Sequence, residues 1–551
     1  MKVHLLNRPD YQPQDDIAPF KEDLCQDLVL DPILKIMGKG DNYVEQQCRT
    51  ILLTPLTDRQ NLLHRQSALR DAIRNSKTIL QLYATVAEVV TDISNYKTSH
   101  RNGNPLPAVR VLNAVEQLDL LANGLQRLKD VIVNTYGHFT GVIFRDFYDA
   151  FLKEFNAEFV RLVHEKATLL RKNSQDEGEI QISGRIGNGL KADGFVVNVL
   201  SEYQSKRKID IMESLFSTKI HKNEIRISYD DLELNRDCRD LESAGLLHVA
   251  STFDSFSFEL MKMFNSLRQQ LAFYHGCCNL YNHMKNMVFP VCFPEVNMTG
   301  SHAITGQSFY DLGVAVRDQR LPAPNDLSGE DTLTYLITGT NHGGKTTFIR
   351  SIATSQLMAQ CGMFVPAKSM ETQIFIGFFT HFVRSEDASM TAGKLEEELR
   401  RLSKIVDNLS SGSIIFLNES FATTSERDAA AIADDIVRAF YDNEITCFFV
   451  THIYAFAKKA YDAGTPRMQF LQAERTIEGQ RTYRMKQGEP SVTGYGMELY
   501  EEIINGRKIV PDVNEDAYVE PENAVQDDYE EEVPQGYFDE AAYIQSTPEE
   551  E

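Results

Sequence analysis

One short segment of this sequence has residue types and spacing suited to holding phosphate. It fits the pattern G-x-x-x-x-G-K-[ST] and comprises Gly339, Thr340, Asn341, His342, Gly343, Gly344, Lys345 and Thr346, followed by Thr347. Glycines here let backbone amides turn toward phosphate oxygens at the start of a helix. The Lys345 ammonium would neutralise the β- and γ-phosphates, and the Thr346 hydroxyl would bind Mg²⁺. The pattern therefore predicts an ATP site that uses Mg²⁺.

A carboxylate at the end of a later apolar run is the second candidate. Residues 413–418, SIIFLN, predict a strand that ends at Asn418, with Glu419 next. P-loop ATPases normally offer an Asp for Mg²⁺ at this point, followed in some classes by a catalytic Glu. Asn418 can still accept a hydrogen bond from a magnesium-bound water, and Glu419 can orient or deprotonate the attacking water. The alternative interpretation is that Glu419 is an ordinary surface carboxylate.

His452 is the third candidate because it follows the apolar run ITCFFVT at 445–451. At the end of a central strand beside a phosphate loop, an imidazole is placed to sense the γ-phosphate. A lone histidine is more often a structural residue, so its position in the fold has to decide between the two roles.

These candidates stand in a region that alternates strands with helices, which is typical of an α/β fold. Predicted strands are 333–338, 373–380, 413–418 and 445–450, and predicted helices are 345–361, 394–409 and 426–441. Two β-rich runs, 467–474 and 481–486, predict a hairpin. We therefore expect a P-loop α/β ATPase domain at residues 301–510.

The preceding part of the chain has helical periodicity. Predicted helices are 57–75, 111–136, 143–172 and 256–286. Between them, GEIQISGRIGNGLKADGFVVNVL is rich in β-formers and glycines and predicts strands and turns. We therefore expect an N-terminal segment at 1–19 and a helical domain at 20–300, with a small module inserted at about 173–225.

The composition is that of an ordinary globular protein. The chain has 551 residues, of which 42% are hydrophobic and 25% charged, which suggests two or three domains. No apolar run approaches the roughly 18 residues that a membrane helix needs, and the N-terminus has no signal-peptide core. Eight cysteines occur without a Cys-x-x-Cys pair, at positions 25, 48, 238, 277, 278, 292, 361 and 447. This pattern argues against a zinc site and favours reduced thiols in a cytoplasmic protein.

Acidic residues are concentrated at the C-terminal end. Residues 511–551 hold 15 Asp and Glu and no Lys or Arg, so removing 15 charges from the net charge of −23 leaves −8 for the first 510 residues. Such a composition predicts a disordered acidic tail. Two roles stay open for the tail: a solvated extension, or a segment that competes with nucleic acid for a basic surface.

Several motifs together resemble the MutS family, in the order in which that family has them. GTNHGGKTT resembles its phosphate loop, usually written GPNMGGKST, and Pro324-Asn325-Asp326 resembles the segment before that loop. CGMFVPA, NESFATTSERDA, Thr451-His452 and KQGEPSVTGYG resemble its later ATPase motifs. Upstream, ILLTPLTDRQNLLHRQSAL is similar to the start of the family's helical lever domain. The resemblance covers residues 20–510.

The resemblance implies roles for the matching residues. Gly339 to Thr347 would hold phosphates, Thr346 and Asn418 would contact Mg²⁺, Glu419 would be the catalytic carboxylate, and His452 would be the γ-phosphate switch. Thr424, Ser425 and Asp428 match the loop that communicates between paired ATPase sites. Because the family dimerises through this domain and binds DNA, the resemblance also implies a homodimer that contacts duplex or branched DNA, with no membrane partner.

Three departures from the family pattern modify these expectations. Asn418 replaces an Asp, which affects the rate of hydrolysis more than binding. Gly393 stands where the family's Ser-Thr-Phe signature has its serine, so the contact with the partner's γ-phosphate is expected to differ. The lever begins near residue 20 and the ATPase domain is followed by the acidic tail, so we expect no mismatch-reading domain, no Phe-x-Glu wedge and no nuclease domain.

The sequence thus predicts a multidomain α + α/β protein, in which a helical domain with a small insertion precedes the P-loop ATPase domain. The resemblance implies that the helical domain is a lever, that the insertion is a clamp and that the ATPase domain is of the ABC type. The predicted function is an ATP-dependent DNA-binding clamp that binds and hydrolyses ATP as a dimer in DNA repair or recombination. Two alternatives stay open: an ATP-driven switch that grips a protein or ribonucleoprotein, and a scaffold that binds ATP but hydrolyses little.

Overall fold

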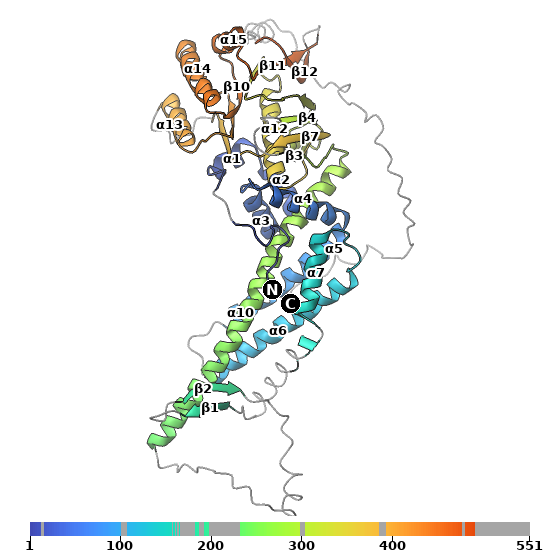
Figure 1. The fold of residues 1–551 in the computed structure, drawn as a ribbon, viewed down its shortest axis with the longest axis vertical. Helices are drawn as coiled ribbons and strands as arrows, with labels where there is room; N and C mark the ends of the chain where they lie inside the picture. The colour runs from blue at the N-terminus through green and yellow to red at the C-terminus, as the bar shows by residue number, and fades with distance from the viewer. Residues whose placement is uncertain are drawn as a thin grey trace, which may run out of the picture. The chain divides into compact units, whose positions relative to one another are not determined.

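The computed structural model describes residues 1–12, 16–100, 107–156, 158–159, 161, 165, 182–186, 192–197, 232–297, 304–384, 393–476 and 480–490. Met1–Tyr495 form one compact unit, and the second unit, Gly496–Glu551, lies outside the described residues, as does the predicted acidic tail. Within these ranges the mixed helical and α/β architecture predicted from the sequence is confirmed (Figure 1). No helix among them combines the length and the apolar character that crossing a membrane requires.

Helices dominate the first half of the chain. They are α1 (Lys21–Asp27), α2 (Asp31–Gly38), α3 (Asn42–Leu52), α4 (Arg59–Arg74), α5 (Ser76–Ser99), α6 (Pro107–Asn134), α7 (Val142–Glu154) and α10 (Leu232–Asn286). Asp41 and Asp58 begin α3 and α4, because their side chains accept hydrogen bonds from backbone amides of the first turn. Helix α10 packs along α5 and α6 and also contacts α2, α3 and α4 (Figure 1).

Two predicted helix boundaries in this region are wrong. The helix predicted at 256–286 begins already at Leu232. The helix predicted at 143–172 is interrupted, since α7 ends at Glu154 and Phe155 leaves the helical conformation. Asn156 then accepts a hydrogen bond from the Phe159 amide at 2.8 Å. A local side-chain bond of this kind starts a new turn in place of continuing the old helix.

The predicted inserted module is described only at its two strands. Strand β1 (Ile182–Ile186) pairs antiparallel with β2 (Ala192–Val197), which places Ile182 opposite Val197. The rest of the module predicted at about 173–225 lies outside the described residues.

A six-stranded sheet forms the centre of the second half. Its strands are β6 (Thr334–Thr338), β8 (Gly377–Phe382), β9 (Ser413–Asn418), β10 (Thr446–Val450), β11 (Met468–Arg475) and β12 (Arg481–Gln487). Their order is β12-β11-β6-β10-β9-β8, and all neighbours run parallel except the β11–β12 pair, the predicted hairpin. Four helices accompany the sheet: α12 (Lys345–Gln360), α13 (Lys394–Val406), α14 (Glu426–Asp442) and α15 (Tyr454–Asp462).

Both faces of the four strands β6, β8, β9 and β10 are buried, as expected for parallel strands. Tyr335, Phe416 and Phe448 lie on the face that packs with α12, and the rings of Tyr335 and Phe448 stack with centroids 4.0 Å apart. The opposite face shares a second core with α13, α14 and α15. Alternate residues of each strand therefore contribute to different cores, which fixes the strand register.

A smaller four-stranded sheet corrects one strand prediction. It consists of β3 (Glu295–Asn297), β7 (Ser369–Gln373), β4 (Ile304–Phe309) and β5 (Asn325–Leu327), and α11 (Leu312–Asp318) follows β4. The single strand predicted at 373–380 is in fact the end of β7 and most of β8, which belong to different sheets. The turn between them is held by the Gln360 side chain, which donates to the Phe375 carbonyl at 2.9 Å and accepts from its amide at 3.2 Å.

Candidate functional site

The predicted phosphate-binding segment is a loop between β6 and α12, and we call residues 339–344 the glycine loop. Gly339 has φ +129° and Gly344 has φ +85°, values that favour glycine. A Cβ on Gly339 would lie 2.8 Å from the Cβ of Ala473 on β11, so a larger residue would not fit there. The loop conformation therefore depends on the glycines for both dihedral and steric reasons.

Lys345 is buried at the base of the glycine loop. Its Nζ donates to the carbonyl oxygens of Gly339 at 3.0 Å and Thr340 at 2.8 Å. Burial lowers the pKa of Lys345 to about 8, against the opposing effect of the Glu419 charge. A cation with few neutralising neighbours at this position is suited to an anionic ligand.

Thr346 and Asn418 are in direct contact although 72 residues separate them. The Thr346 hydroxyl donates to Asn418 Oδ1 at 3.2 Å, where β9 ends. The two side-chain oxygens thus form one cluster that could supply ligands to Mg²⁺, a cation that prefers oxygen donors and keeps several of its waters.

Glu419 and His452 form the second contact of the site. His452 Nε2 donates to Glu419 Oε1 at 3.0 Å, and the Glu419 side chain is 39% exposed. This hydrogen bond is the main cause that lowers the pKa of Glu419, with a smaller contribution from the Lys345 charge. Glu419 is therefore an ionised, half-buried carboxylate that can accept a proton or orient water.

Strand order explains why these residues meet. Strand β10 lies between β6 and β9, so the carboxyl ends of all three strands point to one edge of the sheet. The amide of Thr451, just past β10, donates to the Ile337 carbonyl on β6 at 3.0 Å. Predicted site residues from three separate segments are thereby brought together at the ends of adjacent parallel strands, where α/β proteins commonly bind ligands.

The remaining loop residues differ in exposure. Asn341 and His342 are exposed at the tip of the loop, while Thr347 is half-buried on α12. Thr340 Oγ1 is buried, and the described residues offer it no hydrogen-bond partner. An orphaned buried hydroxyl next to a buried ammonium is a physical feature that a phosphate group would satisfy. The residues present therefore fit ATP and Mg²⁺.

One contact that supports the site was not predicted from the sequence, although Asn325 belongs to a motif quoted there. Asn325 donates from Nδ2 to the Tyr483 carbonyl at 3.2 Å and accepts at Oδ1 from the Met485 amide at 2.7 Å. These bonds hold β12 against the start of β5. The same Tyr483 carbonyl lies close to the glycine loop, since a Cβ on Gly344 would be 3.3 Å from it. The hairpin itself was predicted, but its position beside the loop comes from long-range pairing that periodicity does not reveal.

The segment that contains Thr424, Ser425 and Asp428 forms the start of helix α14. Ser425 begins α14, where its hydroxyl accepts from the Asp428 amide at 3.2 Å and donates to the Asp428 carboxylate at 2.8 Å. Thr424, just before the cap, is half-buried. Gly393 begins α13, and residues 385–392 before it lie outside the described residues.

Comparison with known protein families matches most of the chain in two blocks. The family model of the MutS2 N-terminal domain matches residues 57–287, and that of MutS domain V matches residues 335–518. The second block contains the glycine loop, Glu419 and His452.

Curated relatives agree with these matches. The DNA mismatch repair protein MutS of Petrotoga mobilis is 23% identical over 443 residues, which cover 74% of this chain and 52% of that protein. MutS of Thermus aquaticus is 31% identical over 32% of the chain and 21% of its own length, and human Msh3 is 26% identical over 47% and 26%. The matched regions thus span between about a fifth and a half of these relatives.

Proposed function

This chain belongs to the MutS family, and from that premise we propose that it is an ATPase that controls binding to DNA in repair or recombination. The observation that carries the ATPase part is the convergence of Lys345, the Thr346–Asn418 pair and the Glu419–His452 pair at the ends of three adjacent strands.

In the proposed reaction each group has one task. The glycine loop and Lys345 hold the phosphates of ATP, and Glu419 orients the attacking water and accepts its proton as the γ-phosphate leaves ADP. The hydrogen bond from His452 keeps the Glu419 carboxylate ionised and oriented. Thr346 and Asn418 would hold Mg²⁺, which when bound neutralises phosphate charge.

The DNA part of the proposal rests on family membership. We propose that the helices of the first half form the family's lever domain, that the β1–β2 module is its inserted clamp, and that the protein works as a homodimer. The sequence has basic residues on both sides of the β1–β2 module that could contact DNA, and they lie outside the described residues: Arg171, Lys172, Lys206, Arg207, Lys208, Lys219 and Lys222.

Asn418 favours a second candidate, a scaffold that binds ATP but hydrolyses it little. Its amide accepts from Thr346 as an Asp would, but it brings no negative charge toward a cation. Both candidates require ATP binding, and only the first requires turnover.

The test combines nucleotide and DNA measurements on three proteins. Wild type is compared with Lys345→Ala and with the matched control Lys368→Ala, which removes an exposed lysine. We expect wild type and the control to bind and hydrolyse ATP and to retain DNA in a salt- and ATP-dependent manner, and Lys345→Ala to lose nucleotide binding. ATP binding without turnover would favour the scaffold, and turnover without DNA retention would point to a protein or ribonucleoprotein partner.

A further inference from the structure

The backbone that carries Glu419 adopts an unfavourable conformation. Glu419 has φ +58° and Phe421 has φ +69°, both in the left-handed region that non-glycine residues rarely occupy. The surrounding structure must hold such a turn in place. On one side it does so through the Glu419 amide, which donates to the Val450 carbonyl at 2.8 Å.

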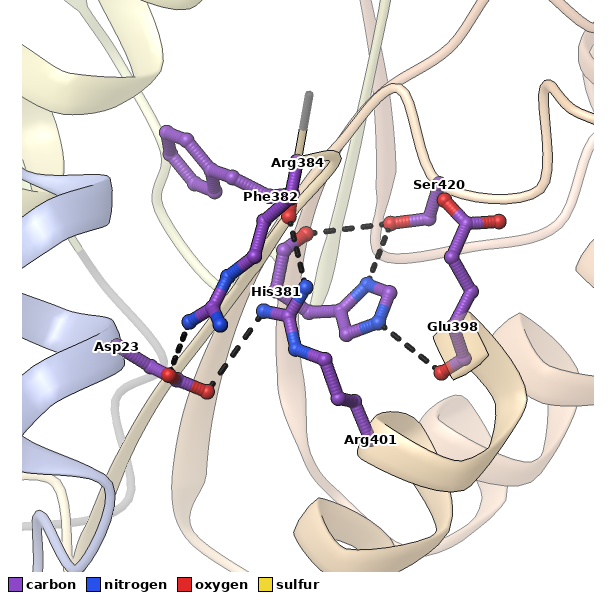
Figure 2. Close-up of polar contacts among 7 residues, drawn as sticks. All are labelled: Asp23, His381, Phe382, Arg384, Glu398, Arg401 and Ser420. Carbon is purple, nitrogen blue, oxygen red and sulfur yellow. Dashed lines mark hydrogen bonds and ion pairs between the residues drawn. The ribbon is translucent and has the colours of Figure 1, made fainter. Parts of the chain in front are cut away.

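On the other side the turn is held through the residue between them, Ser420. Its hydroxyl is buried and lies 2.8 Å from Nδ1 of His381 on the neighbouring strand β8. The same hydroxyl oxygen is 3.2 Å from the His381 carbonyl (Figure 2). The Ser420 hydroxyl thus lies within hydrogen-bond distance of both the ring and the backbone carbonyl of His381.

The imidazole has a second partner that determines its tautomer. His381 Nε2 lies 3.3 Å from the backbone carbonyl of Glu398 on α13, which can only accept (Figure 2). Burial lowers the pKa of His381 to about 4, with a smaller effect of the Arg401 charge, so the ring is neutral near pH 7. A neutral ring with its proton on Nε2 donates to Glu398, and Nδ1 is then an acceptor. The single proton of Ser420 is donated to Nδ1 at 2.8 Å in this arrangement, and the His381 carbonyl at 3.2 Å is the alternative acceptor for the same proton.

The end of β8, which carries His381, is held in place by neighbouring charged side chains. Arg401 of α13 donates from Nη1 to the Phe382 carbonyl at 3.2 Å. Asp23 of α1 forms ion pairs with Arg384 and, at 3.7 Å, with Arg401 (Figure 2). The end of β8 is therefore held by α1 and α13, which limits how far His381 can shift.

From these contacts we infer that His381 and Ser420 form a positioning pair, which holds the strained turn so that the Glu419 carboxylate faces the glycine loop. Neither residue is a catalytic residue, because both act through Glu419. The inference rests on the proposed ATPase function and adds two residues to which the sequence analysis gave no role: His381 lies outside the quoted motifs, and Ser420 lies inside NESFATTSERDA. It also links the turn to α13, since the His381 imidazole contacts both the Ser420 hydroxyl and the Glu398 carbonyl.

The main test is Ser420→Ala, which removes the hydroxyl and little else. We expect kcat for ATP to fall about tenfold to a hundredfold, as a small misplacement of a catalytic group does, while ATP affinity and the melting temperature stay near wild type. The matched control is Ser355→Ala, which removes another buried hydroxyl, on α12, and should leave turnover unchanged.

A double-mutant cycle separates positioning from general stability. In single-turnover measurements, adding Ser420→Ala to the wild-type protein should lower the rate of ATP hydrolysis. Adding it to Glu419→Gln should not lower the rate of that variant, because the carboxylate that the pair positions is already absent. An equal loss in both backgrounds, or wild-type kcat for Ser420→Ala, would overturn the inference. Wild type without any turnover would overturn the proposed function as well, so the two failures are distinguishable.

A pair of histidine substitutions keeps the test valid even when Ser420→Ala fails to fold. The amide of His381→Asn lies where Nδ1 was and can keep the contact with Ser420, whereas His381→Gln reaches only the Nε2 position toward Glu398. We expect His381→Asn to retain several times the kcat of His381→Gln at equal ATP affinity. Equal rates, or the reverse order, would overturn the pair.

Discussion

The Glu419 carboxylate accepts a hydrogen bond from His452 Nε2 at 3.0 Å, although the two residues follow different strands of the sheet. The bond joins the end of β9 to the end of β10 and is the main reason why the pKa of Glu419 is lowered. His452, which by residue type alone would more often be a structural histidine, is therefore in contact with the candidate catalytic carboxylate.

Loss of either partner should affect hydrolysis and spare binding. Glu419→Gln keeps the size of the side chain but cannot take a proton, so we expect turnover to fall by at least about a hundredfold while ATP stays bound. His452→Ala leaves the carboxylate in place without its donor, and about a tenfold loss is expected. Steady-state turnover and equilibrium ATP binding measure the two effects. Equal turnover in wild type and Glu419→Gln would remove Glu419 from the mechanism.

Asn418→Asp should preserve or increase turnover. The Asp oxygen can accept from the Thr346 hydroxyl as the amide does at 3.2 Å, and it adds a negative charge where Mg²⁺ would bind. ATP turnover across a range of Mg²⁺ concentrations is the measurement, with saturation expected at lower Mg²⁺ in the variant. A complete loss of hydrolysis would show that the site is built around the amide.

Asp27→Asn should stabilise the protein at neutral pH. Burial raises the pKa of Asp27 from 3.8 to about 6, against the opposing charges of Arg401 and Arg384. The carboxylate thus ionises less readily in the folded state, so its contribution to stability is full below pH 4 and is lost as the pH rises through 6.

The free energy of unfolding of Asp27→Asn should therefore exceed that of wild type at pH 7, by an amount of the order of 3 kcal/mol at most. The difference should shrink toward pH 4. Denaturant titrations at several pH values measure it, with Asp407→Asn, an exposed aspartate, as the matched control. A difference that does not change with pH would contradict the assignment of a raised pKa to Asp27.

Removal of the acidic segment after Val510 should tighten DNA binding at low salt. The segment holds 15 acidic residues and no basic ones, so a tethered chain of this charge competes with DNA for any basic surface. Salt screens this competition, and the gain should vanish as ionic strength rises. ATP turnover without DNA should not change. Equal DNA affinity of both proteins at about 50 mM salt, where screening is weak, would leave the segment as a solvated extension or a docking site.

Local sequence was sufficient for most elements whose structure depends on neighbours along the chain. Strand β9 was predicted with its observed bounds, and α12 and α14 nearly so, because a run of apolar residues or a helical period is a local property. One failure was local, because apolar periodicity does not detect the Asn156 side chain that interrupts the helix after α7. Another depended on a distant residue, since the Gln360 side chain holds the turn that divides the strand predicted at 373–380 into two.

For the candidate site, the sequence by itself determined which residues are candidates for the chemistry, since the glycine loop, Asn418, Glu419 and His452 are recognisable from residue type, spacing and family resemblance. Only the tertiary structure decided how they act on one another. The order β6-β10-β9 places His452 next to Glu419, and the adjacent strand β8 brings His381 to Ser420. Strand order pairs segments that are far apart in the sequence, so no local pattern encodes it.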